Sequence, residues 1–133
     1  MNISSPREAF QFLRRRLTSE VEEFWAIALS ADKEVLGAEC LFRGTVDFCP
    51  FHPRDVFRFA YRHNASAVIV AHNHPSGVAL PSDRDRLVTE RLIAAADLLQ
   101  VPVVDHLILA GKSYFSFQEK GELVSALSSP DDR

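Results

Sequence analysis

Short, unbroken apolar runs alternate with polar breaks along most of this chain. Runs of this length, bounded by turn residues, are typical of strands covered on both faces of a sheet. Residues 24–29 and 35–42 are separated by a short polar loop, which favours antiparallel pairing of the two. On the same basis, further strands are predicted at 46–49, 67–71, 103–110 and 114–117.

Three other segments carry apolar residues at helical spacing, and each opens with a residue that favours a helix start. Proline lies in the first turn after Ser5 and after His52, and Ser82 is a good N-cap. The inward face of the helix after Ser82 is expected to consist of Leu87, Val88, Leu92, Ala95, Leu98 and Leu99. Helices interspersed with strands predict an α/β fold, in which one mixed sheet is flanked by helices.

The length of 133 residues suits a single domain, with a core at about 5–121 and a frayed tail at 128–133. A helical turn or two is expected at 121–127. Hydrophobic residues make up 47% of the chain, so a packed core needs no disulfides. Cys40 and Cys49 are therefore expected to be buried strand thiols.

The formal charge of −3 argues against a protein that binds nucleic acid on its own, because such proteins carry a basic surplus. The arginines at 14–16 are better interpreted as a solvated helix face. No secretory signal pattern opens the chain, and the longest apolar run, 24–29, is too short to span a bilayer. We expect a soluble, cytoplasmic protein with no membrane association.

Candidate chemistry begins with His72 and His74, where a predicted strand ends in a loop. Residues i and i+2 of an extended chain point to the same side, so the two imidazoles can converge on one ion. Asp85 follows in the first turn of the helix opened at Ser82 and is a candidate third ligand. The residues alone leave two alternatives open, since loop histidines often only form hydrogen bonds and Asp85 also suits a helix cap.

Hydrolysis at a zinc site also needs a carboxylate that accepts a proton. Glu22 and Glu23 precede the first apolar run and are the candidates. In extended chain they point to opposite faces, so at most one of them faces the site.

The combination is far more specific than its parts. His72-x-His74, seven intervening residues, Ser82, two more and then Asp85 matches the JAMM pattern of the JAB/MPN metalloprotease superfamily. The segments that narrow this resemblance to the RadC-like branch are His72-Asn73-His74-Pro75-Ser76-Gly77, Pro81-Ser82, Gly44-Thr45, His52-Pro53-Arg54-Asp55-Val56-Phe57 and Asp105-His106-Leu107-Ile108. The resemblance covers roughly residues 22–121, and it implies the cytidine deaminase-like layering of JAB/MPN domains.

The resemblance implies that His72, His74 and Asp85 hold one Zn²⁺ per chain. Its Glu-x-Phe register selects Glu22 over Glu23 as the residue that takes a proton from water and passes it to the leaving amine. Ser82 would donate a hydrogen bond to the developing oxyanion. The implied activity is a zinc-dependent, metalloprotease-type hydrolysis of a peptide or isopeptide amide in a peptide or protein substrate.

The alternative function is a metal-stabilised, non-catalytic module in assemblies associated with DNA repair or replication. The stretch before Glu22 is expected to be too short for the helix-hairpin-helix region of longer RadC-like proteins, and no room is expected for the insertions with which eukaryotic relatives grip ubiquitin. His106 is expected to be a buried core histidine or to support a ligand, and His52 and His63 to flank a helix. The substrate and the oligomeric state stay open.

Overall fold

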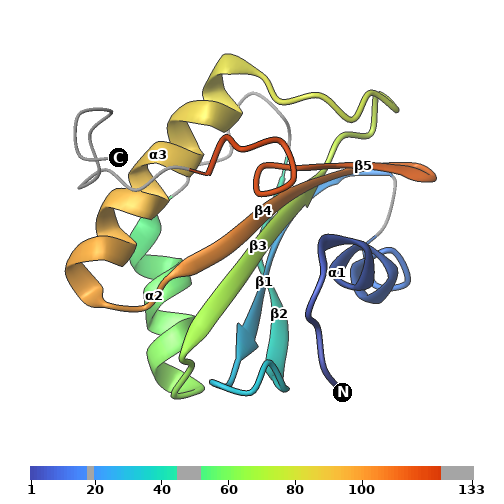
Figure 1. Cartoon of the computed structure of the whole chain (residues 1–133). Helices are drawn as coiled ribbons and strands as arrows, with labels where there is room; N and C mark the ends of the chain where they lie inside the picture. The colour runs from blue at the N-terminus through green and yellow to red at the C-terminus, as the bar shows by residue number, and fades with distance from the viewer. Residues whose placement is uncertain (18–19, 45–51, 124–133) are drawn as a thin grey trace.

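The computed structural model describes residues 1–17, 20–44 and 52–123. Within these ranges the chain forms one five-stranded mixed sheet in the order β2-β1-β3-β4-β5, flanked by three helices (Figure 1). The elements, in chain order, are α1 Pro6–Leu13, β1 Glu22–Leu29, β2 Val35–Gly44, α2 Pro53–Arg62, β3 Ala67–Asn73, α3 Asp83–Leu99, β4 Val103–Ala110 and β5 Ser113–Ser116. The predicted α/β class is confirmed.

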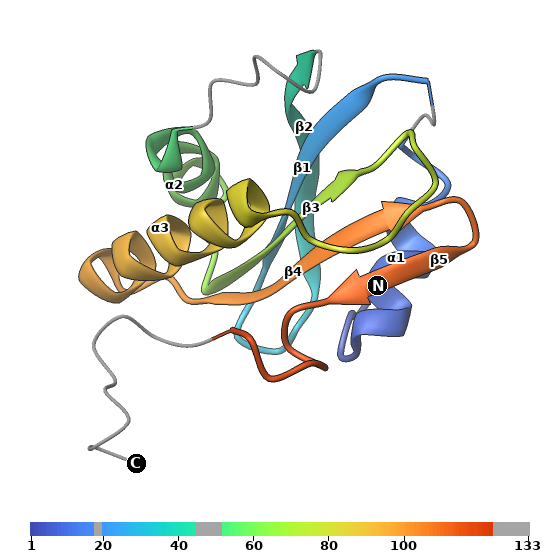
Figure 2. The same ribbon diagram turned by 90° about the horizontal axis from the view of Figure 1, so that it is seen from above.

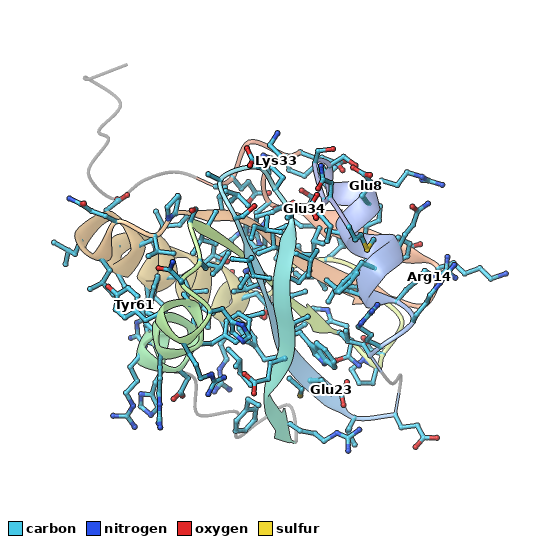
Figure 3. The ribbon with its side chains drawn as sticks, turned by 90° about the horizontal axis from the view of Figure 1, so that it is seen from below. Glu8, Arg14, Glu23, Lys33, Glu34 and Tyr61 are labelled. Carbon is cyan, nitrogen blue, oxygen red and sulfur yellow. The ribbon has the colours of Figure 1, made fainter. Side chains whose placement is uncertain are left out.

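The helices cover both faces of the sheet, which explains why the strands are almost continuously apolar. Helices α2 and α3 pack on one face and α1 on the other (Figure 2). In the view from below, Tyr61 of α2 and Arg14, which follows α1, lie on opposite sides of β2 (Figure 3). Arg14, Arg15 and Arg16 are all exposed, as predicted, but they follow α1 instead of forming a face of it.

Strand alternation directs the buried side chains of β1 into two cores, one on each face of the sheet. Phe24, Ala26 and Ala28 of β1 pack with α2 and α3, whereas Ile27 and Leu29 pack with α1. The central strand β3 is antiparallel to β1 and parallel to β4, and α3 forms the crossover between β3 and β4. The predicted antiparallel pairing of β1 with β2 is confirmed.

Several predicted boundaries are wrong by one or two residues, because ladder pairing extends beyond the apolar runs. β1 begins at Glu22, β2 continues to Gly44 and β3 continues to Asn73, so that His72 lies within a strand. β5 spans Ser113–Ser116 instead of 114–117.

Other predictions from the sequence fall partly or wholly outside the described residues. The predicted strand at 46–49, Cys49 and the predicted tail at 128–133 lie there. Of the predicted helical turns at 121–127, residues 121–123 are not helical and the rest lie outside the described residues. Cys40 is a β2 thiol as predicted, but it is only partly buried.

The prediction for the inward face of α3 is wrong at three of its six positions. Leu87, Leu98 and Leu99 are 44%, 79% and 41% exposed. The buried residues of α3 are Thr89, Leu92, Ile93 and Ala96, with Val88 and Ala95 partly buried beside them. The apolar residues of α3 are spread over more than one face of the helix, and a buried polar residue, Thr89, lies on its inner face.

No helix in the described part of the chain is both long and apolar enough to cross a bilayer.

Candidate metal centre

His72 and His74 are positioned by the end of the central strand. His72 pairs with Phe24 of β1 on one side and with Ile108 of β4 on the other. The backbone N–H of His74 donates to the carbonyl of Leu109 at 2.8 Å, which keeps the chain extended just beyond β3. The two imidazoles therefore lie on the same face of the sheet, the face that α3 covers.

Asp85 is positioned by the capping box that begins α3. The backbone N–H of Asp85 donates to Ser82 Oγ at 3.1 Å, and the backbone N–H of Ser82 donates to Asp85 Oδ2 at 2.8 Å. Asp85 is thus a capping residue, as one of the sequence alternatives held. Its carboxylate also reaches the two histidines, so the capping role and the candidate ligand role coexist in one side chain.

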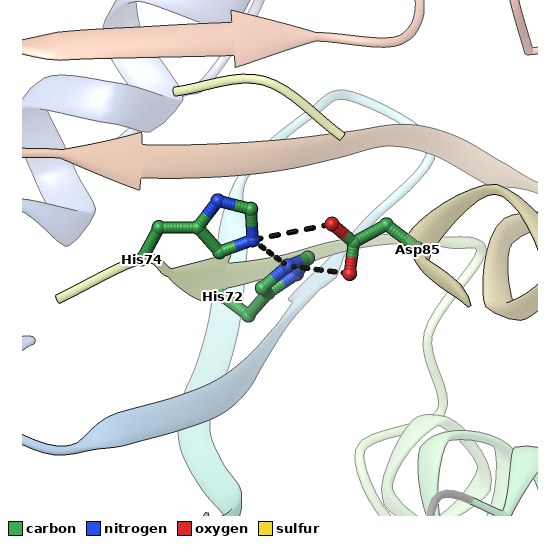
Figure 4. Close-up of side chains that lie close together, drawn as sticks. All are labelled: His72, His74 and Asp85. Carbon is green, nitrogen blue, oxygen red and sulfur yellow. Dashed lines mark hydrogen bonds and ion pairs between the residues drawn. The ribbon is translucent and has the colours of Figure 1, made fainter. Parts of the chain in front are cut away.

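The three side chains converge on one point (Figure 4). His72 Nε2 lies 3.1 Å from Asp85 Oδ1, His74 Nε2 lies 3.1 Å from Asp85 Oδ2, and the two Nε2 atoms lie 3.1 Å apart. Ligand atoms bound at about 2.0 Å to a tetrahedral ion lie about 3.3 Å from one another. Each histidine lies close to a different oxygen of the Asp85 carboxylate, and one ligand atom from each of the three residues lies within 4.8 Å of the other two. Two imidazole nitrogens and one carboxylate oxygen in this arrangement could hold a metal ion with its fourth position open.

The outward nitrogen of each histidine is also bonded. His74 Nδ1 lies 2.9 Å from the carbonyl oxygen of Val78, which can only accept a hydrogen bond, so Nδ1 carries a proton. His72 Nδ1 lies 2.9 Å from Nε2 of His106. His106 is fully buried behind His72 and does not belong to the group that could hold an ion, as predicted.

Charge and burial perturb the titration of these side chains. Burial raises the pKa of Asp85, but hydrogen bonds from His72 and His74 outweigh it and hold that pKa well below its usual range. The hydrogen bond to Asp85 raises the pKa of His74. Burial, followed by the neighbouring His72, lowers the pKa of His106 well below its ordinary value. An aspartate that stays ionised is suited to binding a cation.

Glu22 lines the same cavity, which has a volume of about 300 Å³. One of its carboxylate oxygens, Oε2, is buried and has no hydrogen-bond partner in the described part of the chain. Burial raises the pKa of Glu22, and the nearby His72 and His74 partly oppose this effect. A buried acceptor without a partner is rare, so this oxygen is placed for a ligand or water.

Glu23 lies on the other face of the sheet, as the alternation of an extended chain requires. It is 4% exposed and forms an ion pair with Arg43 at 2.7 Å. It also accepts a hydrogen bond from Trp25 Nε1 at 3.2 Å. Only Glu22 of the two candidates reaches the cavity.

Ser82 and Ser76 also line the cavity, together with the apolar side chains of Phe24, Pro75 and Val88. Accepting the bond from the Asp85 N–H does not use the hydroxyl proton of Ser82, so Ser82 keeps a donor at the cavity wall.

Sequence reasoning missed two polar residues that hold this site together. Asn73, between the histidines, bonds the backbone on both sides of Glu22. Thr89, four residues after Asp85, bonds the Asp85 carbonyl and His106. The signal that could have indicated Thr89 is its position, because it is a polar residue on the same face of the helix as Asp85 and Leu92.

The mixed sheet and the potential metal site fit a JAB-like domain, and comparison with known proteins identifies the family. Residues 3–122 match the family model described as RadC-like JAB domain. The chain belongs to this family.

Three similar proteins carry the family name UPF0758. UPF0758 protein STH371 of Symbiobacterium thermophilum is 42% identical over 92% of this chain and 53% of its own length. A UPF0758 protein of Thermotoga maritima is 46% identical over 91% of this chain and 54% of its own length. UPF0758 protein YeeS of Escherichia coli is 45% identical over 90% of this chain and 82% of its own length. The chain therefore spans about half the length of the first two relatives.

Proposed function

We propose that this domain is a zinc-dependent hydrolase that cleaves a peptide or isopeptide amide in a peptide or protein substrate. The observation that carries the proposal is the buried Oε2 of Glu22, which has no hydrogen-bond partner in the described ranges. This oxygen borders the cavity that His72, His74 and Asp85 also line. A purely structural metal site needs no such carboxylate.

The donor set supports zinc over the hard cations. Mg²⁺ and Ca²⁺ prefer oxygen ligands, whereas two imidazoles with one carboxylate form a common catalytic zinc set. When bound, a zinc ion supplies Lewis-acid chemistry, because it lowers the pKa of coordinated water to about 7 and polarises a carbonyl oxygen.

The side chains of this protein would do the rest. Glu22 accepts a proton from the attacking water, holds it at its carboxylate and delivers it to the leaving amine. The raised pKa of Glu22 suits the first half of this transfer, because the protonated carboxyl forms more readily. Ser82 donates its hydroxyl proton to the oxyanion that develops on the substrate carbonyl. Phe24 and Val88 supply apolar walls that exclude water from the reacting groups.

Zinc content and peptide cleavage, measured on the same preparations, test the proposal. The unmodified protein should carry about one zinc per chain and cleave members of a peptide and isopeptide library followed by mass spectrometry. Glu22→Gln should keep the zinc and lose cleavage, whereas His74→Ala should lose both. Glu23→Gln is the matched control, because its side chain lies on the other face of the sheet, and it should keep both.

Two outcomes would contradict the proposal. Normal cleavage by Glu22→Gln would remove Glu22 as the base. Stoichiometric zinc without cleavage of any library member would favour the alternative, a metal-stabilised binding module in DNA repair or replication-associated assemblies.

A further inference from the structure

His106 of β4 lies between His72 of the candidate metal centre and Thr89 of α3. Both of its ring nitrogens form hydrogen bonds. Its Nε2 lies 2.9 Å from His72 Nδ1, and its Nδ1 lies 2.5 Å from Thr89 Oγ1. The ring is fully buried and stacks on Phe117, with centroids 4.9 Å apart and an interplanar angle of 10°. The position of His106 is therefore fixed by packing as well as by hydrogen bonds.

The direction of each hydrogen bond follows from the carbonyl of Asp85, the acceptor at the end of the series. Thr89 Oγ1 donates its single proton to the carbonyl oxygen of Asp85 at 2.9 Å, and a carbonyl can only accept. Thr89 Oγ1 must then accept from His106, so the ring proton of His106 is on Nδ1. A neutral imidazole carries one ring proton, so Nε2 of His106 must accept from His72 Nδ1.

This direction decides where His72 keeps its own proton. With Nδ1 committed as a donor to His106, Nε2 is the nitrogen of His72 left to bind an ion, and it lies 3.1 Å from both His74 Nε2 and Asp85 Oδ1. Without an ion, Nε2 can itself carry a proton and donate it to the Asp85 carboxylate, which only accepts. We propose that Thr89 and His106 are positioning residues that fix His72 in the one tautomer able to bind a metal ion. This inference rests on the metal site of the proposed function.

His72 needs such a partner because of its place in the sheet. His74 lies just past the strand, where its Nδ1 can donate to the backbone carbonyl of Val78 at 2.9 Å. A carbonyl admits only one tautomer of the histidine that donates to it. His72 pairs with strands on both sides, so the neighbouring carbonyls belong to the ladders. A side chain, that of His106, must therefore orient His72. His106 can fix the tautomer of His72 only if its own tautomer is fixed, and Thr89 fixes it.

The hydrogen bonds also close a ring through two of the three candidate ligands, Asp85 and His72. The ring runs from the carbonyl of Asp85 through Thr89 and His106 to His72, whose Nε2 lies 3.1 Å from the Asp85 carboxylate. It connects α3 to β4 and β3. Partners that orient metal ligands typically contribute 10–100-fold to metal affinity.

Thr89→Val and Thr89→Ser form the central test, since valine keeps the shape and serine keeps the hydroxyl. Zinc affinity is measured by competition with a chromophoric chelator. We expect Thr89→Val to bind zinc about 10–100-fold more weakly than the unmodified protein, and Thr89→Ser to stay within about threefold. His106→Phe, which keeps a ring against Phe117, should lose at least as much affinity as Thr89→Val.

A matched control separates this effect from general destabilisation. Ser116 is also a buried hydroxyl, and it donates to Asp105 at 2.6 Å, away from the metal ligands. Ser116→Ala should lower the melting temperature and leave zinc affinity unchanged. If His106→Phe fails to fold, the threonine pair carries the test, with folding checked by circular dichroism.

The tautomer itself is measured by ¹⁵N–¹H correlation spectra of the imidazoles in metal-free protein at about pH 8, where most histidines are neutral. Nδ1 of His72 is expected to carry a proton in the unmodified protein and in Thr89→Ser, whether or not Nε2 is also protonated, and to carry it only part of the time in Thr89→Val. A His72 ring whose only proton is on Nε2 in the unmodified protein, or equal zinc affinity of Thr89→Val and Thr89→Ser, would overturn the inference. Failure of the unmodified protein to bind zinc would instead overturn the proposed function, and the spectra would still decide the tautomer.

Discussion

The side-chain oxygen of Asn73 accepts a 2.7 Å hydrogen bond from the backbone N–H of Glu23, fifty positions earlier in the chain. The amide nitrogen of the same side chain donates to the carbonyl of Val21 at 2.9 Å. Asn73 therefore bonds the residues on both sides of Glu22. Because Asn73 stands between His72 and His74, one three-residue segment supplies two candidate ligands and fixes the backbone of the candidate base.

Asn73→Ala is expected to loosen Glu22 without removing a ligand. The buried Glu23 N–H loses its acceptor, so its hydrogen exchange should accelerate and unfolding should become easier by about 1–3 kcal/mol. Zinc content should stay at about one per chain, and cleavage of any substrate found should fall. Exchange measured by NMR and denaturant unfolding check the structural part.

Asn73→Asp is the comparison variant, because it keeps the acceptor for Glu23 but cannot donate to Val21. The Glu23 N–H should exchange with solvent more slowly in Asn73→Asp than in Asn73→Ala. Unchanged exchange at Glu23 in Asn73→Ala would contradict the role assigned to this side chain.

Ser82 combines a cap with a candidate oxyanion donor, and two substitutions separate these roles. Ser82→Ala should lower the free energy of unfolding by about 1 kcal/mol through loss of the cap, whereas Ser82→Gly should cost only a few tenths of a kcal/mol. Both remove the hydroxyl, so both should lower kcat by a similar factor of about 10²–10³. Denaturant unfolding and steady-state kinetics on one cleavable peptide check this. If kcat instead followed stability, so that Ser82→Gly had nearly the kcat of the unmodified protein, Ser82 would act only as a helix cap.

The sequence was informative where chemistry depends on spacing. His72 and His74 two residues apart at a strand end, and Asp85 in the first turn of the next helix, are local patterns that the fold brings to one point. The Glu-x-Phe register chose Glu22, and alternation along β1 does direct Glu22 and Glu23 to opposite faces. The metal, the base and the oxyanion donor themselves stay predictions.

The sequence was uninformative where tertiary contacts override local pattern. Thr89 is a polar residue in an apolar helix, and only the neighbouring His106 of β4 explains its burial. Leu98 is apolar yet 79% exposed, because the sheet contacts a different face of α3. The bonds of Asn73 span about fifty residues and follow from antiparallel pairing of β1 with β3, which local propensity does not encode.

The buried Asp105 gives a pH dependence of stability that does not involve the metal centre directly. Burial raises its pKa, although hydrogen bonds from Ser116, Gln118 and His106 oppose the effect. A raised folded-state pKa means that the folded chain binds the proton more tightly than the unfolded chain. The stabilising contribution is complete below the unfolded pKa of about 3.9 and is lost as pH rises through the folded-state value.

Asp105→Asn removes this titration while keeping the shape. The free energy of unfolding of the unmodified protein minus that of Asp105→Asn should fall as pH rises above about 4, with a slope of at most about 1.36 kcal/mol per pH unit, and then level off. Urea unfolding of both proteins from pH 3 to 8 measures it. A difference that rises with pH would show that the hydrogen bonds to the carboxylate outweigh its burial.

Asp85→Asn separates the capping role of Asp85 from its role as a candidate ligand. The asparagine oxygen can still accept from the Ser82 N–H, which Asp85 Oδ2 accepts at 2.8 Å, so α3 should begin at the same residue. The negative charge between the two histidines is lost, and with it the affinity for a cation. Added zinc should therefore stabilise the unmodified protein by about 2.7 kcal/mol at a free concentration of 100 times its Kd, and should not raise the melting temperature of Asp85→Asn. Calorimetry with and without zinc measures both shifts, and magnesium in place of zinc serves as the control that should stabilise neither protein. Equal stabilisation of the two proteins by zinc would mean that the ion binds elsewhere and that Asp85 serves only as a cap.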